Sequence, residues 1–286
     1  MKYLRCVRCS SGLSVRSLVA DTELEEGFLE CTNCKASFPV ISSVPFLLQD
    51  LASYLSIRAK LGGDLMLMAR SDTMRSYVKE ALKKVGSASR DTTELEKRWV
   101  GIYKKSIGSK FYSIIKDSMK KVPVCNLVLE HGCSIGHVAK ESAKRHVRVF
   151  GIDKSFYGIL EAKREQRKNS DFVVADSINH PFGIQKFDLV MALNLLDIIE
   201  PEGLLNTISF QTGKFLILSD PYDFERGENS VKSKTSPQEL RSKLQDLGFT
   251  LIQNTRRPNH IPWSLEINSR LTLNYRVDLL VAQKNS

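Results

Sequence analysis

The segment from Asn126 to Asp153 constrains the fold of this chain more than any other feature. An apolar run ends at the acidic residue Glu130, a turn rich in glycine and serine follows, and after a helix-like stretch a second apolar run, 147–152, ends at Asp153. Glycine allows a tight turn and a close approach of the backbone to a ligand, and an acid that ends the next strand can accept hydrogen bonds from ribose hydroxyls. This order predicts an α/β domain that binds a nucleoside-like ligand at the turn.

The turn itself reads Glu130-His-Gly132-Cys-Ser134-Ile-Gly136. It resembles the first motif of the class I S-adenosylmethionine (SAM)-dependent methyltransferases, acid-x-Gly-x-Gly-x-Gly, with serine in place of the middle glycine. A dinucleotide-binding domain is the main alternative, but it needs G-x-G-x-x-G at the start of the helix to hold a pyrophosphate. The turn lacks that spacing, and SAM has no phosphate. The resemblance implies a seven-stranded Rossmann-like α/β domain and an enzyme that uses SAM.

The rest of the chain continues the alternation of strands and helices. Apolar runs predict strands over 171–175, 187–193 and 214–218, then a helix over 237–247, and a closing pair of strands over 250–254 and 277–282. This alternation predicts a mostly parallel sheet with helices on both faces and a ligand outside the carboxyl ends of its strands. Five polar residues fall at those ends, namely Glu130, Asp153, Asp176, Asn194 and Asp220.

The resemblance implies roles for residues at these strand ends. Asp153 is expected to hold the ribose, Asp176 to lie beside the adenine, and Ser177 to offer its backbone N–H. The residues expected to bind SAM are Glu130, Gly132, Ser134, Gly136, Asp153, Lys154, Asp176, Ser177 and Asn194.

Catalytic candidates follow from the chemistry of methyl transfer, which is an in-line displacement that needs alignment and the exclusion of water. An amine or imidazole attacks only when neutral, so a carboxylate that takes or orients its proton is useful. Asp197 and Asp220 are the candidates for this role. Asn194 and Tyr222 are expected to orient the acceptor, and Trp263 to shape the pocket. The alternatives are an ordinary helix start for Asp197 and core packing for Trp263.

The segments after the fourth and fifth predicted strands bear on the acceptor. Enzymes that methylate exocyclic base amines or glutamine often carry Asn/Asp-Pro-Pro-Tyr after strand four, whereas 194–197 reads NLLD, without the prolines or the aromatic. Several short features instead resemble the imidazole-directed N-methyltransferases of the histidine, carnosine and ovothiol types. They are Asn194-Leu-Leu-Asp197, Asp220-Pro-Tyr222, His260-Ile-Pro-Trp263, Arg270 and Tyr275. This resemblance implies a nitrogen acceptor on a small molecule or a protein side chain.

The amino-terminal segment carries two C-x-x-C knuckles, Cys6/Cys9 and Cys31/Cys34, with 21 residues between them. Four thiolates in this pattern can close a tetrahedral zinc site. Disulfides are the alternative, disfavoured because the chain shows no signal peptide and no secreted character. The surrounding sequence resembles the small zinc-ribbon family that activates tRNA and protein methyltransferases. Such ribbons also occur fused in front of methyltransferases.

These features divide the chain into a zinc ribbon over 1–50, a basic helical region over 51–121 and a SAM-binding methyltransferase domain over 122–286. The helical region has 16 Lys and Arg against 7 Asp and Glu, a balance of +9 within the chain's +10. Such a patch can meet RNA phosphates, so an rRNA or tRNA methyltransferase is the first alternative function. A solvated helix surface accounts for the same charge without RNA.

Four aromatic residues of the helical region recur at helix-like spacing, which indicates one apolar face packed on the domain or over the ligand. They are Trp99, Tyr103, Phe111 and Tyr112.

The composition fits a protein with a proper core, since 42% of its residues are hydrophobic. No apolar run approaches the roughly 18 residues of a membrane span. We therefore expect a cytoplasmic protein without a membrane partner. The second alternative function is a non-catalytic scaffold that binds SAM weakly or not at all, and the intact cofactor motifs argue against it.

Overall fold

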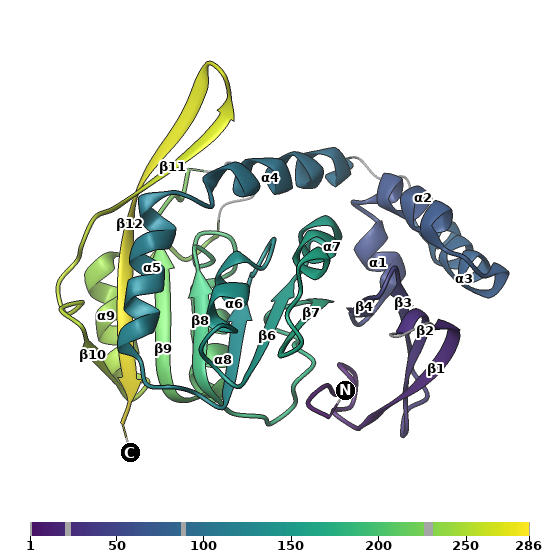
Figure 1. The fold of residues 1–286 in the computed structure, drawn as a ribbon, viewed down its shortest axis with the longest axis horizontal. Coiled ribbons are helices and arrows are strands. Elements are labelled where there is room, and N and C mark those ends of the chain that lie inside the picture. Colours follow the sequence, from purple (N-terminus) through teal and green to yellow (C-terminus); the bar gives the residue numbers. More distant parts are fainter. Residues whose placement is uncertain (1, 21–23, 87–89, 226–230, 286) are drawn as a thin grey trace.

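The computed structural model describes residues 2–20, 24–86, 90–225 and 231–285. A continuous sheet runs through the molecule in the strand order β1-β2-β3-β4-β7-β6-β5-β8-β9-β12-β10, and β11 pairs with β12 beside this path. Figure 1 shows the central strands with helices on both faces and the amino-terminal strands at one end of the sheet.

The central part of the sheet has seven strands. They are β5 (Leu127–His131), β6 (Arg148–Asp153), β7 (Ser170–Ala175), β8 (Phe187–Leu193), β9 (Thr212–Asp220), β10 (Phe249–Ile252) and β12 (Leu271–Lys284). The strands β7-β6-β5-β8-β9 are parallel, whereas β12 runs antiparallel to both β9 and β10. This arrangement confirms the seven-stranded Rossmann-like α/β fold expected from the sequence. The interior strands are apolar almost throughout because both of their faces are covered.

Helices cover the two faces of this sheet and enclose two hydrophobic cores. On one face lie α6 (His137–Ser142) and α7 (Phe156–Arg164), and on the other lie α8 (Pro201–Gln211) and α9 (Pro237–Asp246). The helix predicted over 237–247 is α9, which begins with a capping box between Ser236 and Glu239. Gly248 follows this helix with a φ of +82°, which glycine adopts without strain.

The amino-terminal strands form an antiparallel ribbon that joins the central sheet. They are β1 (Leu13–Ala20), β2 (Leu24–Cys31), β3 (Ser37–Ile41) and β4 (Val44–Leu47). β4 pairs in parallel with β7, where Phe46 lies opposite Val174 and Leu47 opposite Ala175. The ribbon is therefore bonded to the edge of the sheet, directly beside the strand that precedes Asp176.

The helical region leads from the ribbon across the top of the sheet. It contains α1 (Leu51–Leu55), α2 (Ala59–Met68), α3 (Asp72–Lys83), α4 (Thr93–Ser106) and α5 (Lys110–Lys121). Figure 1 shows α4 passing over the carboxyl ends of the parallel strands, and this helix contacts both α7 and β11 (Ile261–Asn268). Strand β11 and the first half of β12, which the sequence did not predict, form a hairpin that extends above the sheet.

Among the helices of the described residues, none combines the length and the apolar character that crossing a lipid bilayer requires.

Candidate active site

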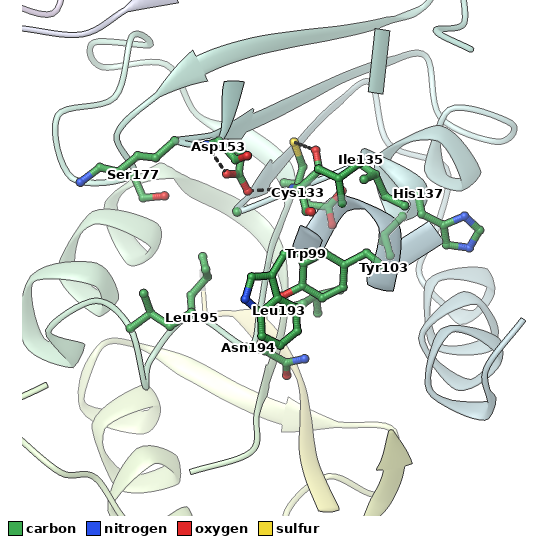
Figure 2. A pocket seen from close by; sticks show the side chains of 18 of the residues that line it. Trp99, Tyr103, Cys133, Ile135, His137, Asp153, Ser177, Leu193, Asn194 and Leu195 are labelled. Carbon is green, nitrogen blue, oxygen red and sulfur yellow. Dashed lines mark hydrogen bonds between the residues drawn. The ribbon is translucent and has the colours of Figure 1, made fainter. Parts of the chain in front are cut away.

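A cavity of about 420 Å³ lies where the carboxyl ends of β5 to β8 face α4. Its wall has two parts. The strand-end wall comes from the loops that follow the parallel strands and includes Glu130, Gly132, Ser134, Asp153, Lys154, Ser177 and Asn194. The covering wall comes from α4, α5 and the β11–β12 hairpin and includes Trp99, Tyr103, Phe111, Tyr112, Trp263 and Tyr275. Figure 2 shows residues of both walls around the cavity.

The turn after β5 requires the small residues that the sequence places there. Gly132, Ser134 and Gly136 have φ values of +63°, +47° and +68°, in the left-handed region that side chains disfavour. A Cβ atom on Gly132 would also lie 2.5 Å from Leu195 Cδ2. Ser134 tolerates this conformation, and its backbone N–H donates to Asp153 Oδ2 at 2.8 Å. The serine in place of the middle glycine is thus compatible with the turn.

Asp153 ends β6 and is held by backbone donors on both sides. Its Oδ2 accepts from Ser134 N at 2.8 Å and its Oδ1 from Ser155 N at 2.7 Å. Burial raises the pKa of this carboxyl, and the two backbone N–H groups act in the opposite direction. Each carboxylate oxygen has a second lone pair, so the side chain can also accept hydrogen bonds from a ligand in the cavity.

Glu130, one residue before the end of β5, is the most deeply buried acid of the strand-end wall, with 3% of its surface exposed. Burial raises its pKa to about 8, and the charge of Asp153 adds to this effect. Within the described residues, its Oε2 is buried without a hydrogen-bond partner. A cation or a donor in the cavity would satisfy this oxygen and stabilise the charged carboxylate.

The residues that directly follow β6 and β7 either line the cavity or support its wall. Lys154 and Ser177 line the cavity, whereas Asp176 does not belong to the wall formed by the described residues. Asp176 Oδ2 lies 2.5 Å from Lys154 Nζ, and its Oδ1 accepts from Ile178 N at 2.6 Å. This carboxylate therefore fixes the loop that presents Ser177.

Asn194, directly after β8, lies in the cavity wall with a φ of +57°, a conformation that asparagine tolerates better than most residues. Its backbone N–H donates to Ser219 O at 2.7 Å, and its Oδ1 accepts from Ser219 Oγ at 2.8 Å. Two hydrogen bonds to the end of β9 thus fix the orientation of this side chain.

Asp197 and Asp220 lie near the same strand ends but are fully buried, and neither belongs to the cavity wall of the described residues. Asp220 Oδ2 accepts from Leu196 N at 3.0 Å. Asp220 therefore supports the loop after β8 from below, and residues 194, 195, 198 and 199 of that loop line the cavity. The sequence pattern placed both acids at the correct edge of the sheet but could not tell which way they face.

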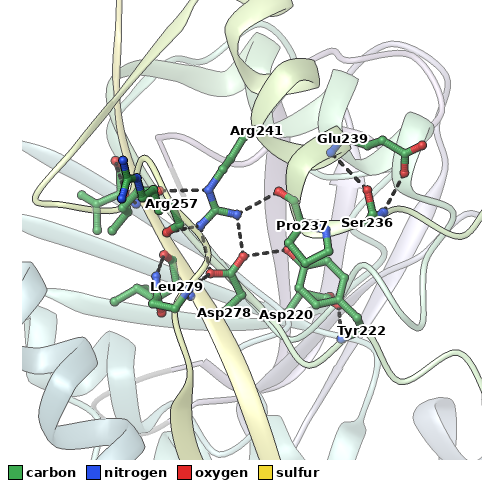
Figure 3. A network of polar contacts seen from close by, with 12 residues as sticks. Asp220, Tyr222, Ser236, Pro237, Glu239, Arg241, Arg257, Asp278 and Leu279 are labelled. Atoms are coloured by element: carbon green, nitrogen blue, oxygen red, sulfur yellow. Dashed lines mark hydrogen bonds and ion pairs between the residues drawn. The ribbon is translucent and has the colours of Figure 1, made fainter.

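Tyr222 also lies outside that wall, in a polar network between β9, α9 and β12 (Figure 3). Its backbone N–H donates to Asp220 Oδ1 at 2.7 Å, and its hydroxyl donates to Asp278 Oδ2 at 2.9 Å. Arg241 Nη1 contacts the same Asp278 oxygen at 2.6 Å. The hydroxyl of Tyr222 is thus engaged in anchoring the segment after β9.

Aromatic side chains make up most of the covering wall, including the four that the sequence placed on one helical face. Trp263 Nε1, on the hairpin, is buried without a hydrogen-bond partner among the described residues. His137, at the start of α6, also lines the cavity, and burial lowers its pKa. His137 was not predicted, since a single histidine after a glycine turn carries no distinctive spacing.

The four cysteines of the two knuckles converge at the amino-terminal end. Their Sγ atoms all lie within 4.8 Å of one another, with Cys6 and Cys34 3.6 Å apart and Cys9 and Cys31 3.4 Å apart. Zinc–sulfur bonds of about 2.3 Å in a tetrahedron separate the sulfurs by about 3.8 Å. The cluster therefore has the ligand number, type and spacing for one zinc ion.

Comparison with known proteins agrees with this geometry. Residues 128–209 match the profile of a family described as "Methyltransferase domain". No curated protein matches the chain. One similar solved structure is the magnesium protoporphyrin IX methyltransferase from Synechocystis with bound S-adenosylhomocysteine (SAH), at 18% identity and a TM-score of 0.51 over 68% of this chain and 95% of that one.

A second similar structure is a chain from the complex between the Haloferax volcanii Trm112 methyltransferase activator and a putative methyltransferase. It shares 16% identity, with a TM-score of 0.52 over 67% of this chain and 98% of that one. At these identities the likeness establishes the fold. The matched segment spans β5 to α8, and it contains the turn, Asp153 and Asn194. The strand-end wall therefore lies in the segment that matches a methyltransferase domain, and the fold around it is that of the two methyltransferase structures.

Proposed function

We propose that this protein transfers the methyl group of SAM to a nitrogen atom of a small molecule or a protein side chain. The observation that carries the proposal is the strand-end wall. There a glycine turn, a buried acid with an unsatisfied oxygen, and an acid at the end of the next strand face one cavity.

The strand-end wall fits the polar groups of SAM. Asp153 is suited to the ribose hydroxyls, and the buried Oε2 of Glu130 to the ammonium group of the methionine part. Gly132 lines the cavity, and its lack of a side chain makes room for Leu195, which also lines it; Ser177 borders the place proposed for the adenine. When bound here, SAM supplies an electrophilic methyl group on a sulfonium sulfur.

The side chains of this protein would act by positioning and by excluding water. Asn194, fixed by Ser219, is placed to orient the acceptor nitrogen. The covering wall keeps water from the reacting atoms. We assign Asp220 and Tyr222 to holding the loops after β8 and β9, and the buried Asp197 to the same support, in place of the direct catalytic roles expected from the sequence.

We also propose that Cys6, Cys9, Cys31 and Cys34 bind one structural zinc ion. The ribbon would then support the strand-end wall through the pairing of β4 with β7. Tyr54, on the helix α1 that follows β4, adds a hydrogen bond from its Oη to Lys154 O at 2.7 Å. A structural metal is thus linked to the edge of the cofactor site.

The basic helical region gives less support to an RNA substrate than its net charge indicates. At least four of its 16 basic side chains pair with acids outside the region, and these pairs compensate four of its nine net positive charges. Lys104 pairs with Glu161 on α7, and Lys116 with Glu141 on α6. Charges that hold the helical region on the domain are already compensated, so we favour a small-molecule or protein acceptor.

Isothermal titration of the zinc-loaded protein with SAM and SAH tests the proposal, with NADH as the control for a dinucleotide site. We expect micromolar binding of SAM and SAH and none of NADH. Binding of NADH alone would favour a dinucleotide-binding domain. Absence of binding by all three in a folded protein would favour the scaffold alternative. Binding of bulk tRNA that weakens steeply with salt would favour the RNA alternative.

A further inference from the structure

The covering wall gathers six aromatic side chains from three separate elements around the outer half of the cavity. Trp99 and Tyr103 lie on α4, Phe111 and Tyr112 on α5, and Trp263 and Tyr275 on the β11–β12 hairpin. The chain has two tryptophans in all, and both belong to this wall. Figure 2 shows Trp99 and Tyr103 on the side of the cavity away from Asp153 and Ser177.

Trp263 is the centre of this group. Its ring is parallel to that of Tyr103, with an interplanar angle of 1° and centroids 6.2 Å apart. Phe111 lies 5.1 Å from it and Tyr275 5.6 Å, between centroids. The tryptophan is 6% exposed, whereas Trp99, Tyr103 and Tyr275 keep partly exposed surfaces at the cavity. Trp263 supports Tyr103 on one side, and the partly exposed ring of Tyr103 offers a stacking surface to a further ring.

The covering wall is almost without charge. The lining residues of α5 and the hairpin are all uncharged, and the one acid that α4 contributes, Glu96, is paired with Arg58 at 2.6 Å. Burial lowers the pKa of the neighbouring His137, which favours its neutral imidazole. The cation nearest the cavity, Lys154, is paired with Asp176. An anionic ligand would therefore find no uncompensated cation among the described residues of this wall.

We propose that the covering wall binds a neutral, planar aromatic or heteroaromatic amine as the methyl acceptor, with its ring stacked on the Tyr103 ring that Trp263 supports. This inference rests on the proposed function, and it names the class of substrate for the same cavity. The lone pair of the acceptor nitrogen forms a bond to the methyl carbon as the methyl–sulfur bond breaks. The electron pair of the broken bond stays on sulfur, and the methylated nitrogen releases its proton to solvent.

Because the two tryptophans both line the cavity, they report on its occupancy directly. Protein labelled with 5-fluorotryptophan should give two fluorine resonances, which Trp99→Phe and Trp263→Phe assign. The protein is titrated, without and with saturating SAH, with three small probes. Aniline is planar and neutral, benzylamine has a planar ring and a positive charge, and cyclohexanol is neutral and saturated.

We expect aniline to shift the Trp263 resonance and to bind at least fivefold more tightly than benzylamine or cyclohexanol. Cyclohexanol binding as tightly as aniline would overturn the role of aromatic stacking, and tighter binding of benzylamine would overturn the neutral charge. SAH binding without any response to aniline would overturn the inference alone. A response to aniline without SAH binding would support an aromatic binding site on the covering wall and overturn the proposed cofactor.

Variants at Tyr103 distinguish the loss of aromatic stacking from a general disruption of the covering wall. Tyr103→Leu should weaken aniline binding at least threefold while SAH affinity stays within twofold, and Tyr103→Phe, which keeps the ring, should bind aniline as the wild type does. Equal losses for the leucine and phenylalanine variants would contradict stacking at this position. If Tyr103→Leu fails to fold, the Trp99→Leu and Trp99→Phe pair gives the same comparison.

Discussion

The two walls of the cavity differ in how the chain builds them. The strand-end wall comes from short loops after successive strands, and each loop is fixed by a local pattern of an apolar run followed by a turn or an acid. The covering wall is assembled from α4, α5 and a hairpin near the carboxyl end, which are far apart in the sequence. The fold therefore specifies the cofactor part of the site locally, whereas the acceptor part depends on tertiary packing.

The largest expected effect comes from the ribbon, which contacts the strand-end wall. Removing zinc with a chelator, or making Cys31→Ser, should lower the melting temperature by roughly 10 °C, because the binding energy of a structural zinc is folding energy. SAH affinity should fall in parallel, since β4 pairs with β7. Calorimetry with metal analysis measures both. Cys125→Ala, at a buried cysteine outside the cluster, is the control. Zinc-free protein with unchanged melting and binding would refute the link.

Asp153→Ala should have the next largest effect, and it should weaken binding at the strand-end wall without affecting binding at the covering wall. Loss of the carboxylate removes the proposed ribose contact and its hydrogen bonds with Ser134 N in the turn and Ser155 N before α7, so SAH should bind at least tenfold more weakly. Titration calorimetry measures this, with aniline binding at the covering wall as the internal comparison. Asp171→Ala changes an acid of β7 outside the cavity wall and should bind SAH normally. Unchanged SAH affinity in Asp153→Ala would contradict the cofactor assignment.

The raised pKa of Glu130, a residue of the strand-end wall, predicts that the stability of the ligand-free protein depends on pH. Its pKa of about 8 in the folded protein lies above its ordinary value, so the folded state binds this proton more tightly than the unfolded state does. The free energy of unfolding should therefore fall as the pH rises toward 8. Glu130→Gln should therefore stabilise the ligand-free protein near pH 8 and change it little near pH 4.

The same carboxyl should couple SAM binding to pH. A bound cation favours the charged form, so wild-type affinity should rise roughly tenfold between pH 6 and pH 8. Glu130→Gln should bind SAM more weakly at pH 8 and lose most of this rise. Parallel pH profiles for the two proteins would show that Glu130 does not contact the cofactor.

The smallest effect is expected for Tyr54→Phe, which tests whether α1, the helix that follows the ribbon, supports the cavity wall. The variant removes one hydrogen bond to Lys154 O and leaves that carbonyl without its donor, a loss of about 1 kcal/mol. Chemical denaturation should show this loss, and SAH affinity should fall about twofold to fivefold. A loss of stability without any change in SAH affinity would limit the role of Tyr54 to packing.

Much of the strand-end wall could be predicted from sequence because its information is local. Strand β8 was predicted with its observed bounds, and Gly132, Ser134 and Asp153 lie in the cavity wall, whereas Gly136 does not. The direction of a side chain at a strand end is not local information. Asp197 and Asp220 share an edge with Asn194, yet Asp220 faces Leu196 N below the loop, and Asn194 lines the cavity.

The covering wall could be predicted only in part. The helical spacing of the aromatics indicated a common face, but not that Trp99 and Trp263 lie in one cavity, because their approach depends on where α4 crosses the sheet. Strand β11 was missed although Ile261, Trp263 and Leu265 alternate with exposed residues. This period-two pattern was the available signal for the hairpin.

A crystal structure of the zinc-loaded protein with SAH tests the central claim most directly. The account predicts ribose hydroxyls on Asp153, the amino group on Glu130, and the sulfur facing an open space bounded by Trp263 and Tyr103. SAH bound elsewhere, or covering-wall rings that close on the sulfur and leave no space for an acceptor, would contradict the division of the cavity into a cofactor wall and an acceptor wall.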